Sequence, residues 1–255
     1  MDEFEAGADF LIEGLVVSEP SFRAGAAPEL NDFQIEGRLD RHGPDIAPIW
    51  RVANPQLDLM SGARLPCTMR KISSVYLAGP ERWTANAREL GERQRQICEA
   101  AGVEPLFWAD WETLARDGSE VEARQIYASA LAMIRKSDAV VANLTPWRGP
   151  SAHPGVAFEV GFASALKKPV FAFINLADED DAEYRGRVER LQGASMHESG
   201  LWFDAEGAEI EDFGLPETVM LWAEARQVYC IVTPDPLADL TGLELCLEAM
   251  RAYAD

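Results

Sequence analysis

From about residue 71 onwards, short apolar runs alternate with longer amphipathic segments. The apolar runs are ISSVYLAG (72–79), VEPLF (103–107), DAVVANL (138–144), KKPVFAFIN (167–175) and QVYCIVT (227–233). Each has the length of a strand, and a continuous apolar run bounded by turn residues is typical of a strand buried on both faces. The pattern therefore predicts about five parallel strands.

The segments between these runs have apolar residues at the spacing of an amphipathic helix. The expected helices are Thr84 to Ala101, the segment carrying Ile126, Ala130, Met133 and Ile134, the segment that contains Glu159, and Leu237 to Tyr253. A longer charged connection is expected from about Leu176 to Trp222. Alternating strands and helices predict an α/β fold with helices on both faces of a parallel sheet. Ligands bind such sheets beyond the carboxyl ends of the strands, so we expect the functional site there.

The first seventy residues have a different pattern. Their apolar stretches are short (FLIEGLVV, FQIEGRL and IAPIWRV) and are separated by turn signals such as RHGPD and NPQ. This pattern predicts short strands or an irregular wrapping arm, and no long helix. We expect residues 1–70 to form a small irregular or β appendage of unknown role and residues 71–255 to form the main domain.

Composition narrows the class of protein. A formal net charge of −20 in 255 residues argues against binding to a nucleic acid polymer. No apolar run has the length of a membrane-spanning helix, and the acidic start MDEFEAGADF does not resemble a signal peptide. The four cysteines are widely spaced and only three histidines are present, so we expect reduced core thiols, no metal site and a cytoplasmic location.

The stretch SAHPGVAFEVG, residues 151–161, places Glu159 in the first turns of a helix, directly after Pro154 and Gly155. The positive end of a helix favours a carboxylate there whatever its function, so a solvated structural position is one interpretation. The surrounding residues are almost all apolar, which instead favours a paired carboxylate or one placed in a pocket. The pattern alone leaves both interpretations open.

Further candidates lie in the loops at the same end of the predicted sheet. They are Gly79, Pro80 and Trp83 after the first strand, Trp108 and Asp110 after the second, and Asn143, Trp147 and His153 after the third. A tryptophan here can stack on a base or simply pack in the core, and Asn143 can bond a ligand or cap its own loop. Arg82, Arg88 and Arg148 can receive a 5'-phosphate or remain solvated.

Four motifs together resemble the nucleoside 2-deoxyribosyltransferase family, most closely its purine-type branch. They are YLAGP (76–80), SDAVVANLTPWRGPSA (137–152), GVAFEVGFASALKKPV (155–170) and IEDFGLP (210–216). The similarity spans residues 71 to 253 and keeps the order of the family's motifs. It implies a flavodoxin-like three-layer sandwich, homo-oligomeric active sites, no cofactor, and a nucleoside or nucleotide with a free nucleobase as substrates.

The resemblance also implies roles for individual residues. Glu159 matches the nucleophile that attacks the anomeric carbon, and Tyr76 matches the tyrosine that positions it. The residues expected to contact the substrate or shape its site are Gly79, Pro80, Trp83, Asp110, Asn143, Trp147, His153, Gly155, Thr218 and Met220. An ionised carboxylate near a helix N-terminus suits this chemistry, because it stabilises an oxocarbenium-like transition state.

Three positions depart from the family's pattern. His153 stands where the family has an aspartate six residues before the nucleophile, Ala130 replaces an aspartate or asparagine, and Thr218 replaces an asparagine. We expect an enzyme that cleaves the N-glycosidic bond of a (deoxy)nucleoside through a covalent glycosyl–glutamate and transfers the sugar to another base. Alternatives are a nucleoside or nucleoside 5'-monophosphate hydrolase, and a catalytically weak nucleotide-binding or regulatory protein.

Overall fold

The computed structural model of the protein describes residues 72–108 and 117–254 and, before them, the two short strands β1 (Ile35–Glu36) and β2 (Ile49–Ala53). β1 lies within the predicted apolar stretch FQIEGRL, and β2 overlaps IAPIWRV and extends one residue beyond it, whereas FLIEGLVV lies outside the described residues.

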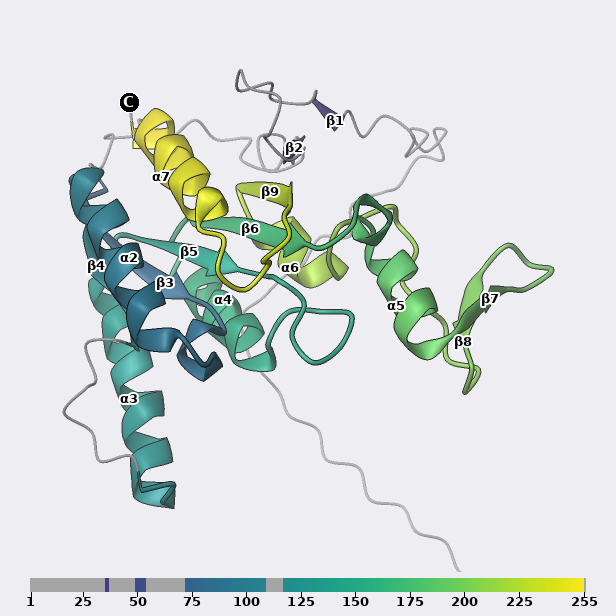
Figure 1. The fold of residues 1–255 in the computed structure, drawn as a ribbon, viewed down its shortest axis with the longest axis horizontal. Coiled ribbons are helices and arrows are strands. Elements are labelled where there is room, and N and C mark those ends of the chain that lie inside the picture. The colour runs from purple at the N-terminus through teal and green to yellow at the C-terminus, as the bar shows by residue number, and fades with distance from the viewer. Residues whose placement is uncertain (1–34, 37–48, 54–71, 109–116, 255) are drawn as a thin grey trace, which may run out of the picture. The chain divides into compact units, whose positions relative to one another are not determined.

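Five parallel strands form the centre of one sheet, as the apolar runs predict (Figure 1). Their spatial order is β4 (Glu104–Leu106), β3 (Ser74–Ala78), β5 (Ala139–Asn143), β6 (Val170–Leu176) and β9 (Gln227–Val232). The neighbours in this order pair in parallel register, for example Tyr76 with Val140 and Asn143 with Phe173. On the far side of β9, β2 pairs antiparallel with β9 and β1 pairs antiparallel with β2.

Helices cover both faces of the parallel strands, which makes three layers (Figure 1). One face carries α2 (Ala87–Ala100) and α7 (Thr241–Ala254), whose Cys98 and Leu243 belong to the same buried cluster as Val75 and Val141. The other face carries α3 (Glu120–Lys136) and α4 (Pro154–Ala165), which contact each other and β3. The α/β sandwich expected from the sequence is therefore confirmed.

The start of α3 is fixed by a local sequence signal. Ser119 is its N-cap and accepts the N–H of Glu122 through the hydroxyl at 3.1 Å, while the Glu122 carboxylate accepts the N–H of Gly118 at 2.8 Å. Such reciprocal bonds satisfy backbone donors that have no partner inside the helix.

The long charged connection after β6 contains more regular structure than its sequence pattern predicts. It holds a 3₁₀ turn, η3 (Glu179–Asp181), the helix α5 (Tyr184–Gln192), the hairpin strands β7 (Ala194–Met196) and β8 (Trp202–Asp204), and the short helix α6 (Val219–Glu224). A second 3₁₀ turn, η1 (Glu81–Trp83), follows β3 and delays the start of α2 to Ala87, three residues later than expected.

Three cysteines lie in the described part of the chain, and all three are buried free thiols: Cys98, Cys230 and Cys246. Burial raises the pKa of the Cys98 and Cys230 thiols to about 12. These cysteines therefore behave as core residues, as expected. Among the described helices, none has the length and apolar character needed to cross a membrane.

Candidate active site

Tyr76 and Glu159 meet at the carboxyl end of the parallel strands. Tyr76 lies on β3 and is 2% exposed, and Glu159 lies one turn into α4 and is half-buried. The Tyr76 hydroxyl donates a hydrogen bond of 2.8 Å to Oε1 of Glu159. Among the described residues it is the one hydrogen-bond donor to this carboxylate, so Tyr76 fixes the orientation of a carboxyl group that solvent can still reach.

The surroundings of Glu159 oppose its ionisation. Burial raises the pKa of Glu159 from 4.5 to about 7; the charge of Glu81 adds to this rise, and the hydrogen bond from Tyr76 reduces it. The Tyr76 hydroxyl keeps its proton, because burial and the neighbouring Glu159 hold its pKa far above the ordinary value. The pair thus consists of a fixed donor and a carboxyl group that titrates near neutral pH.

A second carboxyl group, Glu81, lies at the same end of the sheet, and sequence analysis did not single it out. Its side chain is 3% exposed, and Oε1 accepts hydrogen bonds from Nδ2 of Asn143 at 2.8 Å and from Nε2 of Gln94 at 3.1 Å. Burial raises the pKa of Glu81, while these bonds lower it. In the sequence Glu81 directly follows the Gly79-Pro80 turn, which by itself does not distinguish a buried glutamate from a solvated one.

Gly79 and Asn143 shape the site through Glu81. A Cβ at position 79 would lie 1.9 Å from Oε2 of Glu81, so the Glu81 carboxyl group occupies space that only a glycine leaves open. Asn143 is 3% exposed; besides donating to Glu81, it accepts the N–H of Thr145 through Oδ1 at 3.0 Å. Of the two roles considered for Asn143, the structure shows the loop cap, together with support of a second carboxyl group.

His153 begins α4 as its N-cap. Its Nδ1 accepts the N–H of Gly155 at 2.9 Å, and a Cβ at position 155 would lie 2.9 Å from the same nitrogen. Burial and the positive Arg148 lower the pKa of His153, which keeps the ring neutral with its proton on Nε2. Its ring lies 6.1 Å from that of Trp147. An aspartate at this position, which the resemblance to the family leads us to expect, would make the same kind of bond, so a histidine here keeps the cap.

A buried ion pair ties the loop before α4 to the loop that carries Thr218. Glu217 is 1% exposed and accepts the hydroxyl of Ser151 at 2.6 Å and the N–H groups of Ala152 and Thr218 at 3.0 and 2.8 Å. Arg187 of α5, also 1% exposed, lies 3.8 Å from Glu217. It donates to the carbonyl oxygens of Pro150, Asp181 and Pro216 at 2.6 to 2.7 Å. Thr218 is thereby held close to the start of α4, the helix that carries Glu159.

The remaining candidates differ in their exposure. Trp83 and Met220 are 53% and 79% exposed, Pro80 is buried, and Trp108 belongs to the core cluster on the α2–α7 face. Asp110 lies outside the described residues. Ala130, where the resemblance to the family leads us to expect a polar residue, is buried at 7% exposure.

The arginines considered for a phosphate have partners within the chain. Arg82 lies 3.7 Å from Glu122 and 5.3 Å from the centre of the Trp83 ring. Arg148 lies 5.4 Å from the centre of the Trp147 ring and has a left-handed backbone conformation, with φ 55°. Arg148 also borders a hollow of about 500 Å³ that extends toward Leu176 and Leu237.

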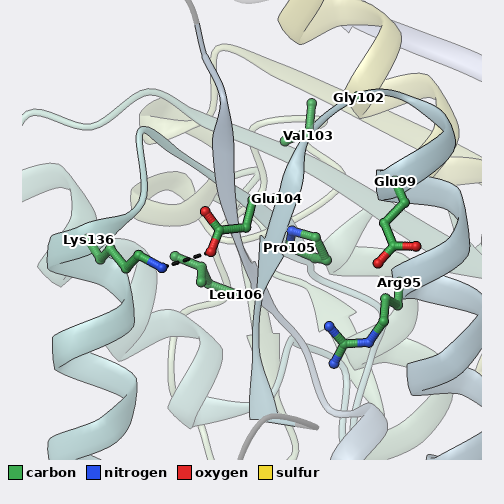
Figure 2. A pocket seen from close by; sticks show the side chains of 8 residues that line it. All are labelled: Arg95, Glu99, Gly102, Val103, Glu104, Pro105, Leu106 and Lys136. Carbon is green, nitrogen blue, oxygen red and sulfur yellow. Dashed lines mark hydrogen bonds and ion pairs between the residues drawn. The ribbon is translucent and has the colours of Figure 1, made fainter.

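A larger hollow, of about 600 Å³, lies around the edge strand β4 (Figure 2). Glu104 of β4 crosses it to pair with Lys136 at 2.7 Å, and Arg95 and Glu99 of α2 form its other side. Lys136 precedes β5, so the hollow borders the end of the sheet where strands begin rather than the end where Glu159 lies. Over residues 72–108 and 117–254, no group of histidine, cysteine, aspartate and glutamate side chains is arranged to hold a metal ion.

Comparison with known proteins identifies the family. The sequence model of the nucleoside 2-deoxyribosyltransferases matches residues 75–220, which is more than half of the chain and includes Tyr76, Glu81, Glu159 and Glu217. The chain belongs to this family. Members of the family are glycosyltransferases or N-glycosidases that act on nucleosides or nucleotides, and the protein is therefore an enzyme of N-glycosidic bonds.

The sequence identity between this chain and individual relatives is low, between 27% and 38% over the matched residues. An uncharacterised protein of Schizosaccharomyces pombe is 27% identical over 160 residues, which are 59% of this chain and 75% of that protein. A Methanosarcina mazei protein with the provisional name 2'-deoxynucleoside 5'-phosphate N-hydrolase 1 is 38% identical over 102 residues, 38% of this chain and 58% of that protein. The solved structure of a 2-desoxiribosyltransferase from Leishmania mexicana is 29% identical, with a TM-score of 0.44, over 58% of this chain and 85% of that one.

Proposed function

We propose that the protein cleaves the N-glycosidic bond of a 2'-deoxynucleoside through a covalent intermediate on Glu159 and transfers the deoxyribosyl group to a second nucleobase. The observation that carries the proposal is the hydrogen bond from Tyr76 to Glu159 at the carboxyl end of the sheet. It holds a half-buried carboxyl group in a fixed orientation without neutralising it, which a nucleophile requires.

In the first step, the Glu159 carboxylate forms a bond with C1' of the sugar while the bond from C1' to the base nitrogen breaks. The electron pair of that bond leaves with the base, which also takes up a proton. In the second step, a nitrogen of the incoming base attacks C1', loses its proton and displaces the Glu159 carboxylate. The negative charge of Glu159 stabilises the oxocarbenium-like transition state of both steps.

Hydrolysis of a nucleoside 5'-monophosphate is the second candidate. The similarity to the Methanosarcina mazei protein, named for hydrolysis of 2'-deoxynucleoside 5'-phosphates, favours it. Water would then replace the second base in the same two-step scheme. Arg148, which lies on the loop that leads to His153, is the arginine best placed to test for a role in phosphate binding.

The family resemblance also underlies our proposals on context. We propose a preference for purine bases, catalysis in a cytoplasmic homo-oligomer, and a catalytic domain formed by residues 71–255. Substrate contacts from Gly79, Trp147, His153 and Thr218 belong to the same proposal; it is supported by Gly79, which follows the strand that carries Tyr76, and by His153, which caps the helix that carries Glu159.

One experiment separates the two reactions. The full chain is incubated with deoxyinosine or deoxyinosine 5'-monophosphate, each with and without adenine, and products are separated by chromatography. Transfer yields deoxyadenosine only when adenine is present, whereas hydrolysis yields free hypoxanthine without it. Glu159→Ala should remove both products, and Glu92→Ala, which changes an exposed carboxylate of α2, should leave the rates unchanged. Turnover by Glu159→Ala at the native rate would exclude the mechanism.

A further inference from the structure

We propose that Glu217 is a positioning residue of the reaction: its buried carboxylate holds the loop that carries Thr218 against the loop before α4, and thereby fixes two sides of the substrate site relative to each other. This role rests on the proposed function, in which His153 and Thr218 contact the substrate. Three features of the structure support it.

The first feature is that one carboxylate is bonded to both loops. Oε1 of Glu217 accepts the backbone N–H of Thr218 at 2.8 Å, which fixes the side chain to its own loop. The same oxygen accepts the hydroxyl of Ser151 at 2.6 Å, and Oε2 accepts the N–H of Ala152 at 3.0 Å. Glu217 is 1% exposed, so water does not replace these donors when a loop moves. Displacement of either loop therefore breaks a hydrogen bond to a buried charge.

The second feature is that Arg187 binds the same two loops one residue further along. Its Nε donates to the carbonyl oxygen of Pro150 at 2.7 Å, and its Nη2 donates to that of Pro216 at 2.6 Å. Nη2 also lies 3.8 Å from Oε2 of Glu217. The donors of a guanidinium group have a fixed planar geometry. Arg187 and Glu217 therefore determine the spacing between the two loops together.

The third feature is that these bonds end at the starts of two helices. Ala152 directly precedes His153, the N-cap of α4, and Thr218 is the N-cap of α6. The two helices contact each other. The position of His153 relative to Thr218 is thus set by the bonds that Glu217 makes to the residues beside them. Both are residues for which we propose a contact with the substrate.

The arrangement predicts how the loss of Glu217 divides between binding and chemistry. Glu159 is oriented by the hydroxyl of Tyr76, and α4 contacts β3, β5 and β6, interactions in which Glu217 has no part. The loops on either side of the Glu217 carboxylate are instead held by it directly. Loss of this carboxylate should therefore weaken substrate binding more than it slows the chemical step.

The first test compares Glu217→Gln with Met250→Ala in the full chain, with whichever of deoxyinosine and deoxyinosine 5'-monophosphate the native chain cleaves. The amide of glutamine adds a donor opposite donors that the carboxylate accepted. We expect KM to rise about tenfold in Glu217→Gln and kcat to change by less than about threefold, the pattern for lost ground-state contacts.

Met250→Ala is the control for a purely structural role. Met250 is 2% exposed in the core cluster with α2 and α7, so its truncation also lowers stability but leaves the bonds of Glu217 in place. Its KM should equal the native value, and a rise as large as that of Glu217→Gln would overturn the positioning role. Ser151→Ala removes one donor and should raise KM by a smaller factor, which decides the question if Glu217→Gln does not fold.

A second measurement does not depend on turnover. In the ¹⁵N-labelled full chain carrying Glu159→Gln, binding of both compounds is measured by calorimetry and amide exchange of Ala152 and Thr218 by NMR. Adding Glu217→Gln should weaken binding about tenfold and speed the exchange of both amides. Unchanged exchange overturns the inference whatever the enzyme cleaves, and faster exchange with unchanged binding leaves Glu217 only a structural role. Absence of binding to either compound before Glu217 is changed would instead reject the proposed function, while the two amides still show whether Glu217 holds the loops.

Discussion

The Nδ1 atom of His153 lies 2.9 Å from the backbone nitrogen of Gly155 and accepts its N–H, which makes a neutral imidazole the N-cap of the helix that carries Glu159. The ring can hold this bond only while Nδ1 has no proton. Because the pKa of His153 is lowered from 6.5, the neutral ring is the form that the fold prefers. The cap therefore contributes stability above pH 6.5 that is lost as the pH falls and the ring becomes protonated.

We expect His153→Asn to keep the cap at every pH, since asparagine accepts the same bond without titrating. Its melting temperature should equal that of the native protein at pH 8 and exceed it at pH 5. His153→Ala should lose about 1 kcal/mol of unfolding free energy at pH 8. Differential scanning calorimetry between pH 5 and 8 measures both. A native protein that keeps the full cap contribution at pH 5 would contradict the assignment.

His153→Asp is a separate prediction about substrates. Aspartate retains the cap and restores the family's carboxylate, so stability at pH 8 should be unchanged. Activity on ordinary deoxynucleosides should rise if His153 is what directs the enzyme to another substrate. Steady-state kinetics with deoxyinosine and adenine test this, with His153→Asn as the uncharged control. Equal activity of the two variants would show that charge at this position has no part in selecting the substrate.

Glu159→Gln should reduce turnover by more than about a thousandfold, because the amide cannot act as the nucleophile. The same change should stabilise the protein at alkaline pH. The pKa of Glu159 is raised to about 7 from 4.5, so the native carboxyl group favours folding while protonated and loses this contribution as pH rises through 7. We expect the variant to melt roughly 2–4 °C above the native protein at pH 8.5, and to differ little at pH 4.

Tyr76→Phe should change the pH dependence of kcat/KM. The hydroxyl of Tyr76 stabilises the charged form of Glu159, so its loss raises the pKa of the nucleophile and moves the acid limb upward. We expect kcat/KM to fall roughly 10- to 100-fold, the usual effect of losing a hydrogen bond to a charged group. Phenylalanine fills the same buried space, and circular dichroism should show an intact fold. A fall in rate without an upward shift would mean that Tyr76 acts on the substrate instead.

Glu217→Gln tests the ion pair that joins the loop before α4 to the loop that carries Thr218. Arg187 would keep its three carbonyl acceptors but lose its buried counter-charge, which should cost about 3 kcal/mol of unfolding free energy. Urea denaturation measures this loss. Glu211→Gln changes an exposed residue of the same loop and should alter stability by less than about 0.5 kcal/mol. Equal effects of the two changes would rule out a structural role for the buried pair.

The sequence predicts the five parallel strands well because each is buried on both faces, which demands an unbroken apolar run. The hairpin and helix between β6 and β9 are missed for the opposite reason. Helix α5 has only Arg187 and Val188 as buried residues, and Arg187 is held by carbonyl oxygens rather than by an apolar face. No periodic pattern marks an element that is held in place by hydrogen bonds from distant loops.

The candidate site also contains residues that the sequence indicates and residues that only the structure shows. The apolar helix around Glu159 leaves a structural and a functional interpretation open, and the resemblance to the family favours the functional one. The structure places Tyr76 beside Glu159. Glu81 was not foreseen, because a glutamate after a Gly-Pro turn is typical of a solvated position. Its burial depends on Gln94 and Asn143, which lie 13 and 62 residues away, and on the missing side chain of Gly79. Only tertiary structure brings these residues together.

The order of the strands also affects whether a strand of another molecule can pair with the edge of this sheet. A strand with one unpaired edge is a template for pairing with another chain and hence for aggregation. β9 has no such edge, because β6 pairs with it on one side and β2 on the other. β4 is the last strand at one end of the described sheet. It is only three residues long and contains Pro105, which lacks an N–H to donate. The outermost strands of the described sheet are therefore short, two residues in β1 and three in β4, and each offers few backbone groups to a strand of another molecule.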